Sequence, residues 1–164
     1  MVVIIIGGPS GCGKSTIGAI VAEKLGIPMI EGDSLHPQSN VDKMASGIPL
    51  TDDDRWGWLN DICIKVEELG NCVVSCSALK KSYRYLLHRQ LERCLVIILM
   101  PSEAELQRRM NARQGHFMKA NMLTSQLDTL EMPTTDETNS VSLCPTDSPE
   151  ETADRVIELF RYGL

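Results

Sequence analysis

The chain has no excess of positive charge. Its 164 residues include 16 lysines and arginines against 22 aspartates and glutamates, which gives a formal net charge of −6. A protein that binds DNA or RNA carries a basic patch or stripe, so this balance argues against a nucleic-acid partner. If the chain binds an anionic ligand, its few cations must be concentrated at that site, and their positions are therefore informative.

The sequence also lacks paired cysteines and long apolar runs. The six cysteines form no C-x-x-C pair and show none of the spacings of a zinc site. The apolar run at residues 2–6 is shorter than a signal peptide or a membrane span requires, and no charged leader precedes it. We therefore expect a cytoplasmic protein with reduced cysteines and no membrane partner.

A phosphate-binding loop is the most specific motif present. Residues 8–15 read G-P-S-G-C-G-K-S, which fills every fixed place of the pattern G-x-x-x-x-G-K-[ST] directly after the apolar run. In such a loop backbone N–H groups surround a phosphate, and the following helix adds the positive end of its dipole. The motif predicts a nucleoside triphosphate site formed by Gly8, Pro9, Ser10, Gly11, Cys12, Gly13, Lys14, Ser15 and Thr16.

Within this loop three side chains have predicted roles. Lys14 is expected to reach the β- and γ-phosphates, Ser15 to ligate Mg²⁺, and Thr16 to contact the α-phosphate. The alternative is a glycine-rich turn in which the lysine has no ligand.

Short apolar segments alternate with helical patterns along the whole chain. After the first strand, further strands are expected at residues 28–31, 72–76, 95–99 and, more weakly, 141–143. Helices are expected at 15–25 and 52–69, the second opened by Thr51 and three aspartates, and at two S-x-x-E capping boxes starting at Ser102 and Ser148. The alternation predicts one α/β domain over residues 1–164, with a five-stranded parallel sheet covered on both faces.

Two polar segments fit this alternation poorly. They cover residues 34–50 and 113–135 and contain Gly, Pro and basic residues. In a kinase such segments form an acceptor-binding excursion, here about residues 34–60, and a lid over the phosphates, here about residues 113–135. Ordinary surface loops are the alternative.

The position of the acidic residues separates the classes of phosphate-loop protein. No N-K-x-D motif of a guanine-nucleotide switch is present, and the third and fourth strands end without the carboxylate of a motor ATPase. Instead the second strand ends in E-G-D at residues 31–33. Since strand ends border the ligand crevice, Asp33 is expected to face the γ-phosphate, either through a magnesium-bound water or by accepting the proton of an acceptor hydroxyl. This arrangement favours a small kinase.

A set of motifs then resembles the gluconokinase family. They are G-D-S-L-H-P at 32–37 with Asn40, K-M-A-S-G-I-P-L at 43–50, D-D-D-R at 52–55, C-S-A-L-K-K at 76–81, G-H-F at 115–117 and L-E-x-P at 130–133. The resemblance implies a P-loop kinase fold of the nucleoside-monophosphate and shikimate kinase type. It also implies ATP- and Mg²⁺-dependent phosphorylation of D-gluconate at its 6-hydroxyl to give 6-phospho-D-gluconate and ADP, and a possible homodimer. Pro9, Cys12, Gly57 and Leu127 depart from the family pattern but remove no charge that the chemistry needs.

Acceptor-binding roles follow for several residues. Arg55 suits the acceptor's carboxylate because a guanidinium matches it through two parallel hydrogen bonds, although it could instead pair with Asp52 or Asp54. His36 could donate to a sugar hydroxyl or be purely structural. Further candidate ligands are Ser77, Ala78, Lys81 and, when the lid closes, His116.

On the nucleotide side two arginines lie one helical turn apart. Similarity to this kinase class implies that Arg109 lies against the adenine, next to the loop at residues 144–147, and that Arg113 contacts the transferring phosphoryl group. Both could instead pair with local carboxylates such as Glu105. A kinase of shikimate or of a nucleoside monophosphate remains the alternative enzyme, and a non-catalytic ATP-binding sensor the alternative class.

Overall fold

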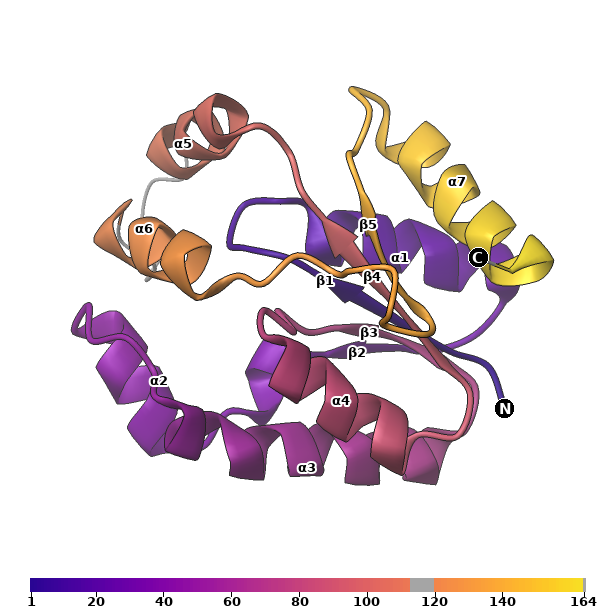
Figure 1. Ribbon diagram of the computed structural model, residues 1–164, viewed down its shortest axis with the longest axis horizontal. Coiled ribbons are helices and arrows are strands. Elements are labelled where there is room, and N and C mark those ends of the chain that lie inside the picture. The colour runs from indigo at the N-terminus through magenta and orange to yellow at the C-terminus, as the bar shows by residue number, and fades with distance from the viewer. Residues whose placement is uncertain (113–119, 164) are drawn as a thin grey trace.

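Five short apolar segments pair side by side as a parallel sheet at the centre of the molecule (Figure 1). A computed structural model describes residues 1–112 and 120–163 of the chain. The strand order is β2-β3-β1-β4-β5. The strands are β1 (Val3–Gly7), β2 (Met29–Glu31), β3 (Cys72–Ser75), β4 (Cys94–Leu99) and β5 (Ser140–Leu143). The predicted five-stranded parallel sheet is confirmed.

The side chains of β1 alternate between two hydrophobic cores. Ile4 and Ile6 face the core shared with α1 (Lys14–Leu25) and α7 (Pro149–Tyr162). Val3 and Ile5 face the core shared with α3 (Asp52–Leu69) and α4 (Lys81–Gln90). Because successive strand residues point to opposite faces, a continuous apolar strand needs helices on both sides. This accounts for the three layers, α1 and α7 on one face and α3 and α4 on the other (Figure 1).

Side-chain caps start two of these helices where the sequence predicts. The Thr51 hydroxyl accepts a hydrogen bond from the Asp54 N–H, and the Asp54 carboxylate accepts one from the Thr51 N–H, so a full capping box opens α3. At α7 the Ser148 hydroxyl accepts from the Glu151 N–H, and proline occupies the first turn. No helix in the described part of the chain is long and apolar enough to cross a membrane.

The remaining elements project beyond the carboxyl ends of the strands (Figure 1). They are the short 3₁₀ helix η1 (Gly32–Leu35), α2 (Gln38–Ala45), α5 (Glu103–Ala112) and α6 (Ala120–Thr129). The polar segment expected to leave the core therefore contains a helix, α2, whose buried residues are only Asn40 and Met44. The domain boundaries and the extent of the lid remain predictions, since residues 113–119 lie outside the described part of the chain.

A buried ion pair joins α4 to the segment that leads into β5. Arg84 is fully buried; its Nε and Nη2 donate to the two carboxylate oxygens of Glu137 at 2.8 and 2.9 Å. Its Nη1 donates to the carbonyls of Ala78 and Leu79, both at 3.0 Å. Four of the five N–H donors of Arg84 are thus used inside the protein, so this side chain serves the fold.

Removing one partner of this pair should destabilise the fold strongly. In Arg84→Met the Glu137 carboxylate stays buried without its counter-charge, and we expect the free energy of unfolding to fall by about 3–5 kcal/mol. Urea denaturation followed by circular dichroism measures the change. Lys24→Met is the matched control, since Lys24 forms exposed ion pairs with Glu150 and Asp154 on the surface and should change stability little. Equal losses in both variants would contradict a structural role for Arg84.

Candidate active site

The carboxyl ends of three neighbouring strands bring the predicted site residues to one edge of the sheet. The phosphate loop follows β1, Asp33 follows β2, and Ser77 follows β3. The Gly8 N–H donates to the Ser77 carbonyl at 2.9 Å, which joins two of these loops directly. Gly8 has a φ of +125°, and a Cβ there would lie 2.4 Å from the Leu99 carbonyl oxygen, so only glycine fits.

The phosphate loop adopts the conformation that its motif predicts. Gly13 ends the loop with a φ of +98° and precedes α1, whose first N–H groups have no partner within the helix and are available to a phosphate. The Lys14 ammonium donates to the Gly8 and Pro9 carbonyls at 2.9 and 3.0 Å, so it lies across the loop. The Ser10 N–H donates to Oε1 of Gln126, a residue of α6, at 2.7 Å. The loop and α6 are thus in direct contact.

Glu31 contacts the phosphate loop, and the sequence analysis did not predict this contact. The Ser15 hydroxyl donates to Glu31 Oε2 at 3.0 Å, and both side chains are exposed. A hydroxyl and carboxylates are the hard oxygen donors that Mg²⁺ prefers, so Ser15, Glu31 and Asp33, two residues further along the chain, are of the types that fit this ion. The available signal was the pair of acids two residues apart at the end of β2, of which only the second was given a role.

A small cavity of about 40 Å³ lies between the phosphate loop, α2, α3 and α6. This acceptor cavity is lined by six residues that the sequence analysis predicts to act on the acceptor or the nucleotide. Its lining consists of Ser10, Lys14, Asp33, His36, Met44, Leu50, Arg55, Trp58, Ser77 and Gln126. The volume is close to that of one water molecule. The side chains that close the cavity must therefore move before a sugar acid can bind.

His36 is held as a neutral hydrogen-bond donor. Its ring stacks on Trp58 with centroids 4.0 Å apart and an interplanar angle of 16°. Asn40 Nδ2 donates to the Asp54 carbonyl at 2.8 Å and also lies 3.2 Å from His36 Nδ1. Because an amide nitrogen is a donor, Nδ1 must accept and the proton resides on Nε2, which lies 3.9 Å from Asp33 Oδ1. Burial lowers the pKa of His36 below its usual value.

Arg55 supplies a buried positive charge to the acceptor cavity. Its side chain is buried among Tyr83, Trp58 and Leu50, and only 9% of the residue is exposed. In residues 1–112 and 120–163 no carboxylate lies within ion-pairing distance of its guanidinium, so the alternative partners Asp52 and Asp54 do not contact it directly. A buried cation without a counter-ion favours an anionic ligand at this position.

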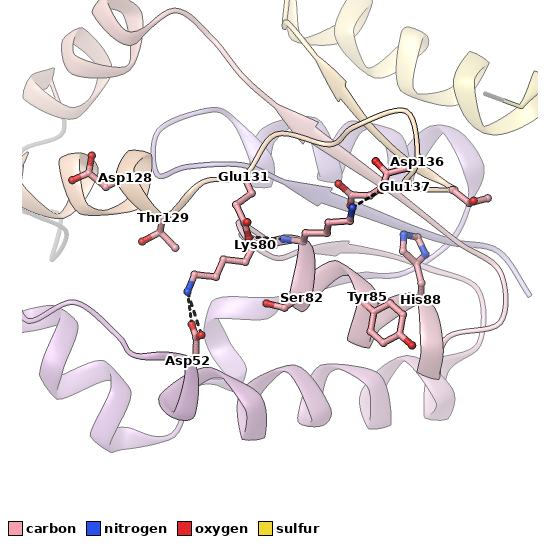
Figure 2. Close-up of a pocket in the computed structure, with 12 residues that line it drawn as sticks. Asp52, Lys80, Ser82, Tyr85, His88, Asp128, Thr129, Glu131, Asp136 and Glu137 are labelled. Atoms are coloured by element: carbon pink, nitrogen blue, oxygen red, sulfur yellow. Dashed lines mark hydrogen bonds and ion pairs between the residues drawn. The ribbon is translucent and has the colours of Figure 1, made fainter.

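Two predicted acceptor ligands lie outside this cavity. Ala78 is fully buried with a φ of +45°, and its carbonyl accepts from Arg84, so its backbone serves the fold. Lys81 is the first residue of α4 and pairs with Asp136 at 2.5 Å. It lines a wide cavity of about 1100 Å³ between α4 and residues 128–138, which contains no phosphate-loop residue (Figure 2). Neither residue lines the acceptor cavity beside Lys14, and their roles as acceptor ligands remain predictions.

A third cavity, of about 320 Å³, adjoins the other side of the phosphate loop. Thr16, Arg109 and the loop at residues 145–147 line it together, as expected for the nucleotide. Arg109 Nη1 donates to the Gly11 carbonyl at 3.2 Å, and its Nε donates to Glu105 Oε1 at 2.8 Å. Arg109 therefore has both the local carboxylate partner and a position beside the loop. Arg113 and His116 lie outside the described residues.

Comparisons with known proteins agree with this geometry. A family model described as shikimate kinase matches residues 10–161. A probable gluconokinase of Schizosaccharomyces pombe is 40% identical over 167 residues, which cover 96% of this chain and 86% of the relative. A crystal structure of a gluconokinase from Sinorhizobium meliloti 1021 has a TM-score of 0.88 and 42% identity, and the match covers 97% of this chain and 91% of that one. The chain belongs to the gluconokinase family.

Membership of the gluconokinase family confirms the predicted P-loop kinase fold and a phosphotransferase that uses an alcohol group as acceptor. The thermoresistant gluconokinase of Escherichia coli is a further relative, 39% identical over 166 residues that cover 98% of this chain and 94% of the relative. The match to the shikimate kinase model reflects the same fold. The roles of individual residues in this gluconokinase family member are predictions that rest on the geometry above.

The neutral His36 predicts how stability depends on pH. A histidine whose pKa is lowered in the folded state binds a proton more readily when unfolded, so stability falls as pH drops below the unfolded value of about 6.5. Burial lowers the pKa of both His36 and His88. We expect the free energy of unfolding to decrease between about pH 7.5 and pH 5.5, with a smaller decrease in His36→Gln.

Urea denaturation at both pH values measures this difference. The pKa values of about 2 for Asp54 and Glu105, which hydrogen bonds from Lys43 and Arg108 lower, place their titration outside the interval. His88→Gln is the matched control for the second histidine. Between the two pH values, the free energy of unfolding of the double variant should decrease less than that of either single variant. An identical decrease in the wild type and in His36→Gln would contradict the neutral state assigned to His36.

Proposed function

We propose that this chain is an ATP-dependent gluconokinase that transfers the γ-phosphoryl group to the 6-hydroxyl of D-gluconate, giving 6-phospho-D-gluconate and ADP. The observation that carries the proposal is the convergence of Lys14, Asp33 and Arg55 on one cavity. Lys14 and the phosphate loop suit the terminal phosphate, Asp33 suits the reacting hydroxyl, and Arg55 suits the carboxylate of a sugar acid.

In this mechanism the protein positions the reactants and compensates charge. The 6-hydroxyl oxygen forms a bond to the γ-phosphorus while the bond from phosphorus to the bridging oxygen breaks, and that oxygen leaves with ADP. The hydroxyl proton passes to the exposed Asp33 carboxylate or to water. Lys14 stabilises the negative charge on the transferring group, since it can turn from the Gly8 and Pro9 carbonyls toward the phosphates.

Magnesium fits the oxygen ligands at the end of β2. Ser15 would hold the ion directly, and Asp33 would hold it through water, with Glu31 beside them. When bound, the ion would supply charge neutralisation on the β- and γ-phosphates. On the nucleotide side Arg109 would contact the adenine, and Arg113 and His116 would complete the site from the lid.

Compartment and assembly are further parts of the proposal. All six cysteines are free, and burial raises the pKa of Cys63, Cys72, Cys76 and Cys94 to about 11 or 12, which suits unreactive thiols in the cytoplasm. The family resemblance implies a possible homodimer, which light scattering of the purified chain tests.

Gluconate-dependent ADP release tests the proposed activity. We expect Lys14→Ala and Asp33→Ala each to lower kcat by at least about 100-fold, because each removes a group that acts on the transferring phosphoryl or the attacking hydroxyl. Thermal denaturation should show that both variants remain folded, since Lys14 and Asp33 lie outside the hydrophobic cores. Asp61→Ala, on the exposed side of α3, is the control and should retain wild-type turnover.

An acceptor panel separates this function from its alternatives. Gluconate should exceed shikimate and nucleoside monophosphates in kcat/KM, because the buried Arg55 suits a carboxylate and the cavity contains several polar groups for hydroxyls. Preferred turnover of shikimate or of a nucleotide would reassign the substrate. Binding of ATP without turnover of any acceptor, or full activity of Lys14→Ala and Asp33→Ala, would overturn the proposed chemistry.

A further inference from the structure

A hydrogen-bonded chain of four side chains leads from the acceptor cavity to the wide cavity beside α4. Arg55 Nη1 donates to Tyr83 Oη at 2.8 Å, and Tyr83 Oη donates to Asp52 Oδ1 at 2.5 Å. Lys80 Nζ donates to the two Asp52 oxygens at 2.9 and 3.2 Å. Figure 2 shows the outer end of this chain, where Lys80 reaches across the wide cavity to Asp52.

The two inner members of this hydrogen-bonded chain are buried, and the two outer members are partly exposed. Arg55 is 9% exposed and Tyr83 is 1% exposed, whereas the side chains of Lys80 and Asp52 are 32% and 44% exposed. A guanidinium in a closed cavity needs negative charge nearby to offset its lost hydration. Asp52 provides that charge at one remove, through the Tyr83 hydroxyl.

The intervening hydroxyl leaves most of the guanidinium available. Arginine has five N–H donors in one plane, and a carboxylate that paired directly with Arg55 would occupy two of them. Tyr83 instead engages only Nη1, while its ring lies 5.4 Å below the guanidinium carbon. The hydrogen bonds from Tyr83 and Lys80 lower the pKa of Asp52, so its carboxylate keeps its negative charge at neutral pH.

We propose that Tyr83 is a positioning residue that orients Arg55 toward the acceptor's carboxylate and thereby sets the preference for a sugar acid over a neutral polyol. This inference rests on the proposed function and adds Asp52 and Lys80 to it as the charges behind the hydroxyl. The carboxylate that binds Arg55 completes an alternating series of charges: acceptor, Arg55, Asp52 and Lys80.

Tyr83→Phe isolates the hydroxyl from the packing of the ring. The ring is buried in the core of α3 and α4 and meets Trp56 edge to face, with centroids 5.4 Å apart, and phenylalanine keeps both contacts. Loss of the hydroxyl frees Arg55 to turn or to pair with Asp52. We expect the KM for gluconate to rise about tenfold, with kcat and the KM for ATP changed less than about twofold.

A neutral competitor makes the test specific to the carboxylate. D-glucitol carries a CH₂OH group where gluconate has its carboxylate, and its inhibition constant against gluconate should stay within about twofold of the wild-type value in Tyr83→Phe. An unchanged KM for gluconate would overturn the proposal. So would equal weakening of gluconate and D-glucitol, because that result indicates general distortion of the cavity.

Asp52→Asn provides a second variant with a matched control. It should also raise the KM for gluconate. The double variant with Tyr83→Phe should have a KM no higher than that of the single variant with the larger increase, because both substitutions break the same hydrogen-bonded chain. Asp53→Asn removes the same charge from the same exposed turn of α3 and should leave the KM unchanged. Additive increases in the KM for gluconate, or an equal increase in Asp53→Asn, would contradict the proposed role of the hydrogen-bonded chain.

The outcomes also separate this inference from the proposed function. If the wild type phosphorylates a different sugar acid, the proposed substrate is wrong, and the same comparison with that acid and its neutral alcohol still tests Tyr83. If the wild type phosphorylates no carboxylate-bearing acceptor, both proposals are overturned. Thermal denaturation of each variant identifies a loss of folding. If Tyr83→Phe does not fold, the comparison of Asp52→Asn with Asp53→Asn tests the proposal instead.

Discussion

Parallel pairing of β1 between β3 and β4 is the constraint on which the site depends. All strands point the same way, so every loop that follows a strand opens at the same edge of the sheet. The hydrogen bond from the Gly8 N–H to the Ser77 carbonyl extends that pairing into the loops. A phosphate loop, a pair of acids and a polar strand end are thereby adjacent although they are far apart in the sequence.

Two buried arginines illustrate how the same side chain serves the fold or the site. Arg84 binds Glu137 through a two-pronged pair and two backbone carbonyls, so its hydrogen-bonding capacity is used within the protein. Arg55 has a neutral hydroxyl as its partner and lies in the wall of a cavity. The difference lies in the partners of each arginine, since burial and charge are alike.

Local patterns account for what the sequence could predict. The apolar runs, the capping residues and the phosphate loop each depend on neighbouring residues, and the strands, α1, α3 and α7 were found from them. The helix α2 was missed because it buries mainly Asn40 and Met44 and has no apolar stripe. Contacts of Ser15 with Glu31 and of Arg55 with Tyr83 depend on tertiary structure, as does the turn of Lys81 toward Asp136. No local pattern encodes them.

The central place of β1 has a consequence for synthesis on the ribosome. This strand is translated before its two partners, which begin at Cys72 and Cys94, so it emerges long before either neighbour exists. Its V-I-I-I stretch is β-branched, uncharged and free of proline, which is the composition of a segment that associates with other chains when exposed. The position that builds the phosphate loop thus leaves this apolar segment without a pairing partner until β3 leaves the exit tunnel.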